Sequence, residues 1–207
     1  MEIEELFDFL VDKFKRVLKD SEIEEESVSF APLKEGVLRA VFKGTAGLAC
    51  TCVRETGTKT LKEICEGRPG ETEEGRACFI ASVNAVMIHI GCAVRNSLCE
   101  DGEPLFCGEN IASYISDNYG SPKVLLVGPK EGIEAGLAKK GLSVMSVSDR
   151  KKPEEADIDG ADLLLISGST VITGTITDYL SLDKEIVFFG MTLAGTAEWL
   201  GVKRLCF

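Results

Sequence analysis

Residues 123–128 read KVLLVG and residues 161–166 read ADLLLI, two short runs that are apolar at almost every position. A third run of this kind, EIVFFG, occupies residues 185–190. Strands that are apolar on both faces are typical of parallel sheets covered by helices on each side. Two more strands are expected at 142–147 and 202–206. Helical patterns alternate with the strands, at residues 131–140, 173–180 and 194–200. This order predicts a Rossmann-like parallel-sheet domain.

The first half of the chain has a different pattern. Apolar residues at steps of three and four predict an amphipathic helix over 2–19. Short β-type runs follow at 28–31, 37–42 and 48–53, the first two joined by a turn at 34–36. Thr72 is a predicted N-cap for a long buried helix that reaches Ile90. Shorter helices are expected at 60–65 and 109–119, with an irregular stretch before the latter. We therefore expect an α/β protein with an N-terminal α+β domain over 1–121 and a ligand-binding domain over 122–207.

Composition narrows the class of protein. The 207 residues carry 34 acids and 23 bases, for a formal charge of −11, and show no Lys/Arg cluster. Such a surface repels phosphate backbones and anionic lipids, so nucleic acid and membranes are not expected partners. The apolar runs are too short to cross a bilayer, and the acidic start, MEIEE, is unlike a secretory signal. The sequence predicts a cytoplasmic location.

Eight cysteines are many for such a chain. Cys50 and Cys52 would share one face of a strand, where two thiolates could hold a soft metal ion. Free thiols buried in the core are the alternative. His89 is the only histidine, which excludes a Ser/His/Asp triad and multi-histidine metal sites. His89 with Cys78 and Cys92 predicts either a soft-metal patch or an ordinary packed helix; Cys92, Cys99 and Cys107 fit no iron–sulfur pattern.

Polar and small residues gather where the predicted parallel strands end. Ligands of open parallel sheets bind beyond the carboxyl ends of the strands. The candidate ligand-binding residues there, with Asn84 from the long helix, are Asn84, Gly128, Ser167, Gly168, Ser169, Thr170, Thr173, Gly190, Met191 and Thr192. The segment 167–175 leads into a helix N-terminus, whose free N–H groups would favour an anion. A plain turn with Ser/Thr caps is the alternative.

Nucleotide-binding signatures are missing from the sequence. Neither G-x-G-x-x-G nor G-x-x-x-x-G-K-[ST] follows a strand. Asp149 lies at the spacing from Gly128 at which a dinucleotide-binding acid could sit, and an ordinary loop aspartate is the alternative reading. Asn84 is predicted either as a structural amide or as a ligand contact, since a buried amide needs hydrogen-bond partners.

Several motifs together resemble a known family. They are FIASVNA at 79–85, LLVG at 125–128, DLLLISGST at 162–170 with TGT at 173–175, and FFGMT at 188–192. In this order they resemble the heavy-metal chelation family, a domain of unknown function in bacteria and archaea. The resemblance covers residues 47–207. It implies an enolase N-terminal-like part, a Rossmann-like domain, and a heavy metal or a metal-chelating, pterin-like small molecule between them. The chain departs from the pattern at Met191, where a proline is expected.

Three functions remain open from the sequence. The first is a small-ligand or heavy-metal-chelate binding protein in metal cofactor handling. The second is an enzyme that uses a nucleotide-like cofactor, such as a transferase. The third is an assembly protein in which the amphipathic first helix serves a homodimer.

Overall fold

The N-terminal part combines an antiparallel sheet with helices. The computed structural model describes residues 1–34, 36–94, 103–128 and 131–206. The four-stranded antiparallel sheet has the order β3-β2-β1-β4. Its strands are β1 (Ser27–Lys34), β2 (Val37–Phe42), β3 (Thr45–Cys50) and β4 (Gly57–Thr60). Its helices are α1 (Ile3–Asp20), α2 (Leu61–Glu66), the 3₁₀ turn η1 (Pro69–Glu71) and α3 (Glu73–His89).

Helix α3 is the centre of the N-terminal part. Its first turn is capped by Thr72, whose Oγ1 accepts a hydrogen bond from the N–H of Gly75 at 3.0 Å. The helix is buried on almost every side, because β2 and β3 pack against it and side chains of α1 contact it as well. The ring of Phe79 lies edge-on to both Phe7 and Phe14 of α1. The apolar stripe of α1 is thus buried within this chain.

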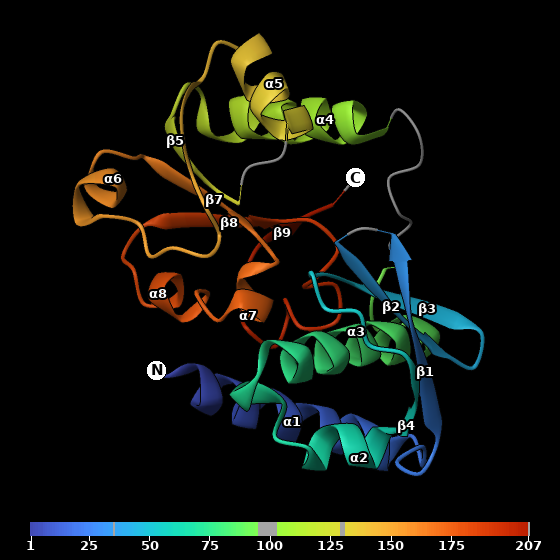
Figure 1. Cartoon of the computed structure of the whole chain (residues 1–207). Helices are drawn as coiled ribbons and strands as arrows, with labels where there is room; N and C mark the ends of the chain where they lie inside the picture. Colours follow the sequence, from blue (N-terminus) through green and yellow to red (C-terminus); the bar gives the residue numbers. More distant parts are fainter. Residues whose placement is uncertain (35, 95–102, 129–130, 207) are drawn as a thin grey trace.

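The C-terminal part is a five-stranded parallel sheet of order β6-β5-β7-β8-β9. The strands are β5 (Lys123–Val127), β6 (Ser143–Val147), β7 (Leu163–Ser167), β8 (Glu185–Phe189) and β9 (Arg204–Leu205). The helices are α4 (Glu103–Tyr119), α5 (Glu131–Lys139), α6 (Glu155–Asp159), α7 (Thr170–Thr173) and α8 (Thr177–Leu180). In Figure 1, α4 and α5 lie on one face of the sheet, and α7 and α8 lie between the sheet and the helices α1 and α3.

The two faces of the parallel sheet belong to different hydrophobic clusters. Leu125 and Ile166 join the large cluster that also holds Phe79, so the core is continuous between the two parts. Leu126 and Leu165 point the other way and pack with α4 and α5. This alternation follows from the two-residue period of a strand. It explains why the strands of this sheet are apolar at successive positions.

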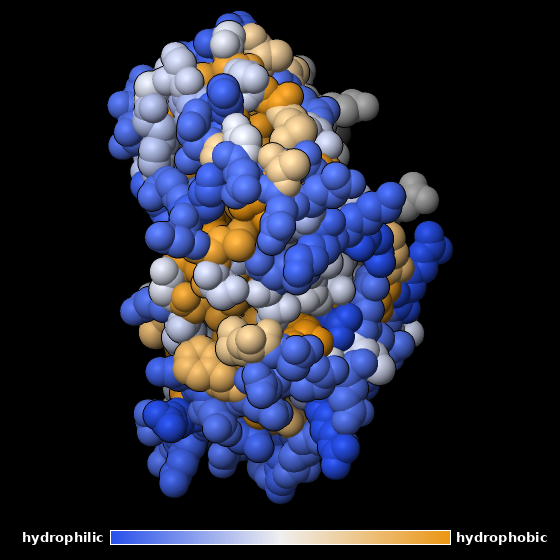
Figure 2. Space-filling model, turned by 90° about the vertical axis from the view of Figure 1, so that its left-hand side faces the viewer, coloured by the Kyte–Doolittle hydropathy of each residue, from blue (hydrophilic) through white to orange (hydrophobic). Residues whose placement is uncertain are grey.

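The predicted fold class is confirmed: an N-terminal α+β part is followed by a parallel-sheet, Rossmann-like part. Figure 2 shows the face that carries α6 and the N-terminus, where hydrophobic residues form separate groups among hydrophilic ones. Within the described ranges, no helix has the length and apolar character needed to span a membrane. The domain boundary at residue 121 stays a prediction.

Several predicted elements were wrong in detail. The helix expected at 173–180 is two short helices, because Gly174 adopts a φ of +90° and ends α7. The helix expected at 194–200 is a series of turns, and the last strand is shortened to Arg204–Leu205. Helix α4 begins at Glu103, inside the stretch expected to be irregular, and β4 was not predicted. Two predictions fall on residues that the structure does not describe: position 35 of the turn at 34–36, and Cys99.

Candidate functional site

A pocket of about 410 Å³ opens at the carboxyl edge of the parallel sheet, where this sheet meets the N-terminal part. One wall comes from the N-terminal part and includes Cys50, Cys52 and Glu73. The floor and the other wall come from the ends of three parallel strands and from α7. The lining residues are Gly36, Cys50, Thr51, Cys52, Glu73, Gly128, Ser146, Val147, Ser148, Asp149, Arg150, Ser167, Ser169, Ile172 and Thr173.

The position of the pocket follows from the strand order. The chain leaves β5 toward β6 on one side, whereas β7 pairs with β5 on the other side. The carboxyl ends of β5 and β7 therefore flank a topological switch point, the usual ligand site of open α/β sheets. Gly128 follows β5 and Ser167 ends β7, and both line the pocket.

Gly128 is required by the close approach of these strand ends. Its φ is +72°, and a Cβ there would lie 2.8 Å from the Cβ of Ser167 and 3.1 Å from that of Asp149. Any other residue would be strained by the backbone angle and would also clash. The glycine thus allows the loops after β5, β6 and β7 to converge.

The floor of the pocket is a chain of hydrogen bonds. The Ser169 hydroxyl donates to Oδ2 of Asp149 at 2.5 Å, and it lies 2.7 Å from the Ser167 hydroxyl. Because the proton of Ser169 is directed at the carboxylate, Ser167 is the donor in the second bond. The N–H of Ser169 also donates to Ser167 Oγ, at 3.3 Å. These bonds fix the orientation of the Asp149 side chain.

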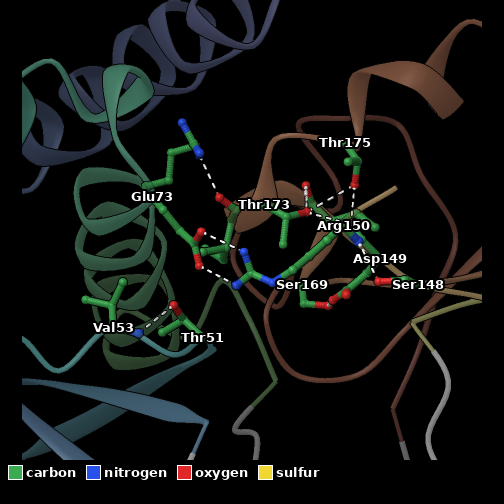
Figure 3. Close-up of polar contacts among 12 residues, drawn as sticks. Thr51, Val53, Glu73, Ser148, Asp149, Arg150, Ser169, Thr173 and Thr175 are labelled. Atoms are coloured by element: carbon green, nitrogen blue, oxygen red, sulfur yellow. Dashed lines mark hydrogen bonds and ion pairs between the residues drawn. The ribbon is translucent and has the colours of Figure 1, made fainter. Parts of the chain in front are cut away.

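The backbone of Asp149 is held as well. Its carbonyl oxygen accepts hydrogen bonds from the hydroxyls of Thr173, at 2.9 Å, and Thr175, at 2.7 Å. Figure 3 shows these threonines and Ser169 directed at Asp149 from the segment around α7. The loop after β6 is thus fastened to the loop after β7. The threonine-rich sequence after β7 has this positioning role in the structure.

An ion pair joins the two parts of the molecule at the pocket. Both terminal nitrogens of Arg150 donate to the Glu73 carboxylate, at 3.0 and 2.8 Å, and Figure 3 shows this fork-like pairing. The hydrogen bonds from Arg150 lower the pKa of Glu73 below its ordinary value, and Glu73 raises the pKa of Arg150 in return. Glu73 is the first residue of α3, where a carboxylate also suits the helix dipole.

The two candidate metal-binding thiols lie at the pocket, although not as predicted. Strand β3 ends at Cys50, and Cys52 lies in a bend, so the expected strand over 48–53 was wrong in its last part. The bend arises because the N–H of Val53 donates to Thr51 Oγ1 at 3.1 Å, a local bond that replaces strand pairing. Both cysteines line the pocket, and Cys52 is exposed. Cys65 and Cys78 are buried elsewhere, and burial raises the pKa of their thiols to about 11 and about 12.

Asn84 lies in the core beside the site. Its amide nitrogen donates to the carbonyl oxygens of Leu48 at 2.8 Å and Thr192 at 2.9 Å, and its oxygen accepts from the N–H of Gly195 at 2.7 Å. The side chain is fully buried. It therefore connects α3, β3 and the segment after β8, and these contacts fit the structural reading of Asn84.

The other predicted residues divide between the pocket and its support. Gly128, Ser167, Ser169 and Thr173 line the pocket with Cys50 and Cys52. Thr192 is buried, and its hydroxyl accepts from the N–H of Cys50 at 3.1 Å, which fastens the thiol wall to the segment after β8. The remaining four do not belong to the lining: Gly168, Thr170, Gly190 and Met191.

The expected anion site at a helix N-terminus stays a prediction. Helix α7 is a single turn, and the N–H of Gly168, just before it, donates to the carbonyl of Phe189 at 2.9 Å. The soft-metal patch around His89 is not formed, since Cys78 is buried and no group of three metal-ligating side chains occurs in the described part of the chain.

Sequence reasoning missed the charged part of the site. Neither Glu73 nor Arg150 was among the residues predicted to form the site. Asp149 was noted at a suggestive spacing but with a loop aspartate as the alternative. No local signal pairs Glu73 with Arg150, because they are 77 residues apart and meet only through the docking of the two parts.

The fold and the site define a two-part α/β protein with a polar pocket at its switch point, and solved structures of the same fold exist. The chain is similar to a DUF364 family protein of unknown function from Pyrococcus horikoshii, with a TM-score of 0.61 and 15% identity over 94% of this chain and 82% of that one. A second, from Desulfitobacterium hafniense, has a TM-score of 0.55 and 16% identity over 96% and 83%. No family model and no curated protein matches the chain. At these identities the likeness concerns the fold alone.

Proposed function

We propose that this protein binds a small polar molecule that carries a soft metal ion, in the pocket between its two parts. The observation that supports the proposal is the composition of that pocket. Two cysteines on one wall line the same pocket as several hydroxyls and the Asp149 carboxylate, at the switch point of the parallel sheet. Thiolates are the protein ligands that soft metal ions prefer.

The donor set fits a metal chelate better than a bare ion. A structural zinc site needs four protein ligands, whereas Cys50 and Cys52 offer two, and the described residues contain no cluster of three ligating side chains. The remaining coordination positions would come from the bound molecule. In this arrangement the cysteines hold the metal and the Ser167–Ser169–Asp149 chain holds the organic part, for which a pterin-like chelator is one chemical type.

Cobalt is a suitable probe for this proposal because thiolate coordination gives a charge-transfer absorption. We expect reduced protein, handled without oxygen, to develop this band on titration with Co²⁺ and a small chelator. Nickel and zinc should compete for the site, and molybdate tests the oxyanion alternative. The Cys50→Ser, Cys52→Ser double variant should lose the band.

The matched control is Cys65→Ser, because Cys65 is buried away from the pocket. This variant should keep the band, provided that it remains folded by circular dichroism. A band that survives the loss of both pocket cysteines, or absence of any metal retained by the wild type, would remove the proposal.

A second candidate is an enzyme with a nucleotide-like cofactor. It is favoured by one observation, namely that Asp149 follows the strand next to β5, beside the switch point where doubly wound sheets bind nucleotides. Thermal unfolding with S-adenosylmethionine, NAD or ATP tests it, since a ligand that binds only the folded state raises Tm. An unchanged Tm with all three counts against this candidate.

A further inference from the structure

We propose that the inner end of the pocket accepts a group rich in N–H or O–H donors, with a protonated amine or guanidinium as the best match, and that it rejects phosphate. This inference rests on the proposed function in so far as it concerns the same pocket. It adds the chemical class of the ligand, which neither the fold nor the thiols specify.

Two backbone N–H groups of the lining, those of Gly128 and Ser169, are already engaged, and so is that of Gly168 behind the lining. Gly128 donates to the carbonyl of Val147 at 2.9 Å, and Gly168 donates to that of Phe189 at 2.9 Å. The N–H of Ser169 is directed at Ser167 Oγ. Anion sites at switch points depend on such N–H groups being unpaired and aimed at the ligand. These three N–H groups already have hydrogen-bond acceptors within the protein.

The protons of three lining hydroxyls, those of Ser167, Ser169 and Thr173, are engaged too. Ser167 donates to Ser169, and Ser169 donates to Asp149. Thr173 donates to the Asp149 carbonyl. What these hydroxyls still offer to a ligand is lone pairs, because each hydroxyl has a single proton. These three hydroxyls therefore present acceptors to a ligand.

Asp149 supplies the strongest acceptor. Its Oδ2 receives the Ser169 proton, whereas Oδ1 accepts no hydrogen bond from any described residue. A half-buried carboxylate oxygen without a donor is well matched to a charged N–H group, since hydrogen bonds between ionised partners are the stronger class.

The charge of the lining points the same way. Among the described residues that line the pocket, Glu73 and Asp149 are acidic and Arg150 is basic. The guanidinium of Arg150 is held by Glu73 through two hydrogen bonds. An incoming anion that reached Arg150 would lie close to the carboxylates of both Glu73 and Asp149. A cation would be attracted by these two carboxylates.

The test compares small probes of matched size on the full-length, reduced protein. Agmatine carries both a guanidinium and an amine, tetramethylammonium is a cation without N–H donors, and inorganic phosphate and pyrophosphate are anions. Backbone amide shifts in two-dimensional NMR locate each probe and give its Kd. We expect agmatine to shift the amides of Gly128, Ser167 and Asp149 in a saturable way, and expect tetramethylammonium and the anions to leave them unchanged.

Asp149→Asn is the decisive variant, because it keeps the shape and replaces the ionised acceptor. It should weaken agmatine binding by about tenfold to a hundredfold, the value of one hydrogen bond to a charged group. Asp178→Asn makes the same change in net charge outside this pocket and should leave the Kd unchanged. Ser169→Ala removes the bond to Oδ2 but leaves Oδ1, so it should retain more of the binding than Asp149→Asn.

Failure of this inference can be told apart from failure of the proposed function. Phosphate or pyrophosphate shifting the floor amides more strongly than agmatine overturns it, as does agmatine binding that is equal in Asp149→Asn and the wild type, or no agmatine binding at all. The cobalt band of the cysteine pair is read independently in the same samples. If the cobalt band forms and the floor nevertheless binds phosphate, the donor-ligand inference is contradicted and the proposed function is not.

Discussion

At the scale of single residues, burial changes the pKa of two thiols, those of Cys65 and Cys78. Desolvation raises their pKa values from an ordinary value of 9.0 to about 11 and about 12. The folded state therefore holds these protons at a pH at which the unfolded chain has lost them. Their contribution to stability is complete below pH 9 and is lost as the pH rises through these values.

We expect the free energy of unfolding to fall with pH in this alkaline range. Urea denaturation at a series of pH values measures this slope. In Cys78→Ala the free energy of unfolding should fall less steeply with pH, when it is compared with the same variant's value at neutral pH. Cys52→Ala is the control, because Cys52 is exposed and should leave the slope unchanged. A slope that is unaffected by replacing both buried cysteines would show that other groups cause it.

Tyr179 offers a second test at this scale. Its side chain is fully buried, and its hydroxyl has no hydrogen-bond partner among the described residues. Burial raises the pKa of this phenol. An unpaired buried hydroxyl is costly, so Tyr179→Phe should raise the free energy of unfolding by about 1 kcal/mol.

The matched variant is Tyr119→Phe, since the Tyr119 hydroxyl donates to Glu185 at 2.6 Å and accepts from Lys203 at 2.8 Å. This change should be neutral or mildly destabilising. Chemical denaturation of both variants gives the comparison. If Tyr179→Phe were the more destabilising of the two, its hydroxyl would have to be hydrogen-bonded in solution.

At the scale of elements, Asn84 is the connection on which three segments depend. Asn84→Asp replaces the amide donor by an oxygen that would face the carbonyls of Leu48 and Thr192. We expect a loss of about 3 kcal/mol, because two hydrogen bonds disappear and two buried acceptors are left unpaired. Asn118→Asp, at an exposed position on α4, should change stability by less than about 0.5 kcal/mol.

This variant also separates the two readings of Asn84. If Asn84 is structural, the binding of agmatine or metal per folded molecule should be preserved at a temperature where Asn84→Asp remains folded. Binding that disappears while the circular dichroism spectrum stays native would instead assign Asn84 to the ligand.

The predictability of the elements from sequence had a clear physical limit. The apolar strands β5, β7 and β8 and the capped helix α3 were predicted, because periodicity and capping are local signals. The ends of β3 and α7 were not, because they depend on the Thr51–Val53 bond and on the left-handed Gly174. In the site, Gly128, Ser167 and Ser169 followed from their places at strand ends, whereas Glu73 and Arg150 required the docking of distant segments.

At the scale of the whole molecule, the Glu73–Arg150 pair is a solvent-exposed link between two parts that also share an apolar core and the buried hydrogen bonds of Asn84. The side chains are 31% and 51% exposed, so solvent screens the pair strongly. A double-mutant cycle with Glu73→Gln and Arg150→Met should give a coupling below about 1 kcal/mol that declines further with added salt. A coupling that is larger and insensitive to salt would show that the link is structural rather than readily opened.

The weakness of this link has a consequence for ligand entry. The pocket is bounded by one wall from each part, and the core beneath it is continuous. Opening the pair therefore costs little, while the parts remain docked through the packing of α3 against α7 and through the hydrogen bonds of Asn84 to Thr192 and Gly195. We expect ligands to alter the side chains at the mouth more than the arrangement of the two sheets.

The central claim is that the pocket between the two parts is the ligand site, and electron density tests it most directly. A crystal of reduced protein, prepared without oxygen and without added ligand or metal, should show density for a retained molecule bounded by Cys52, Asp149 and Ser167. An anomalous signal should lie beside the Cys50 and Cys52 sulfurs. A retained molecule bound elsewhere, with side chains filling the space between Cys52 and Asp149, would contradict the account.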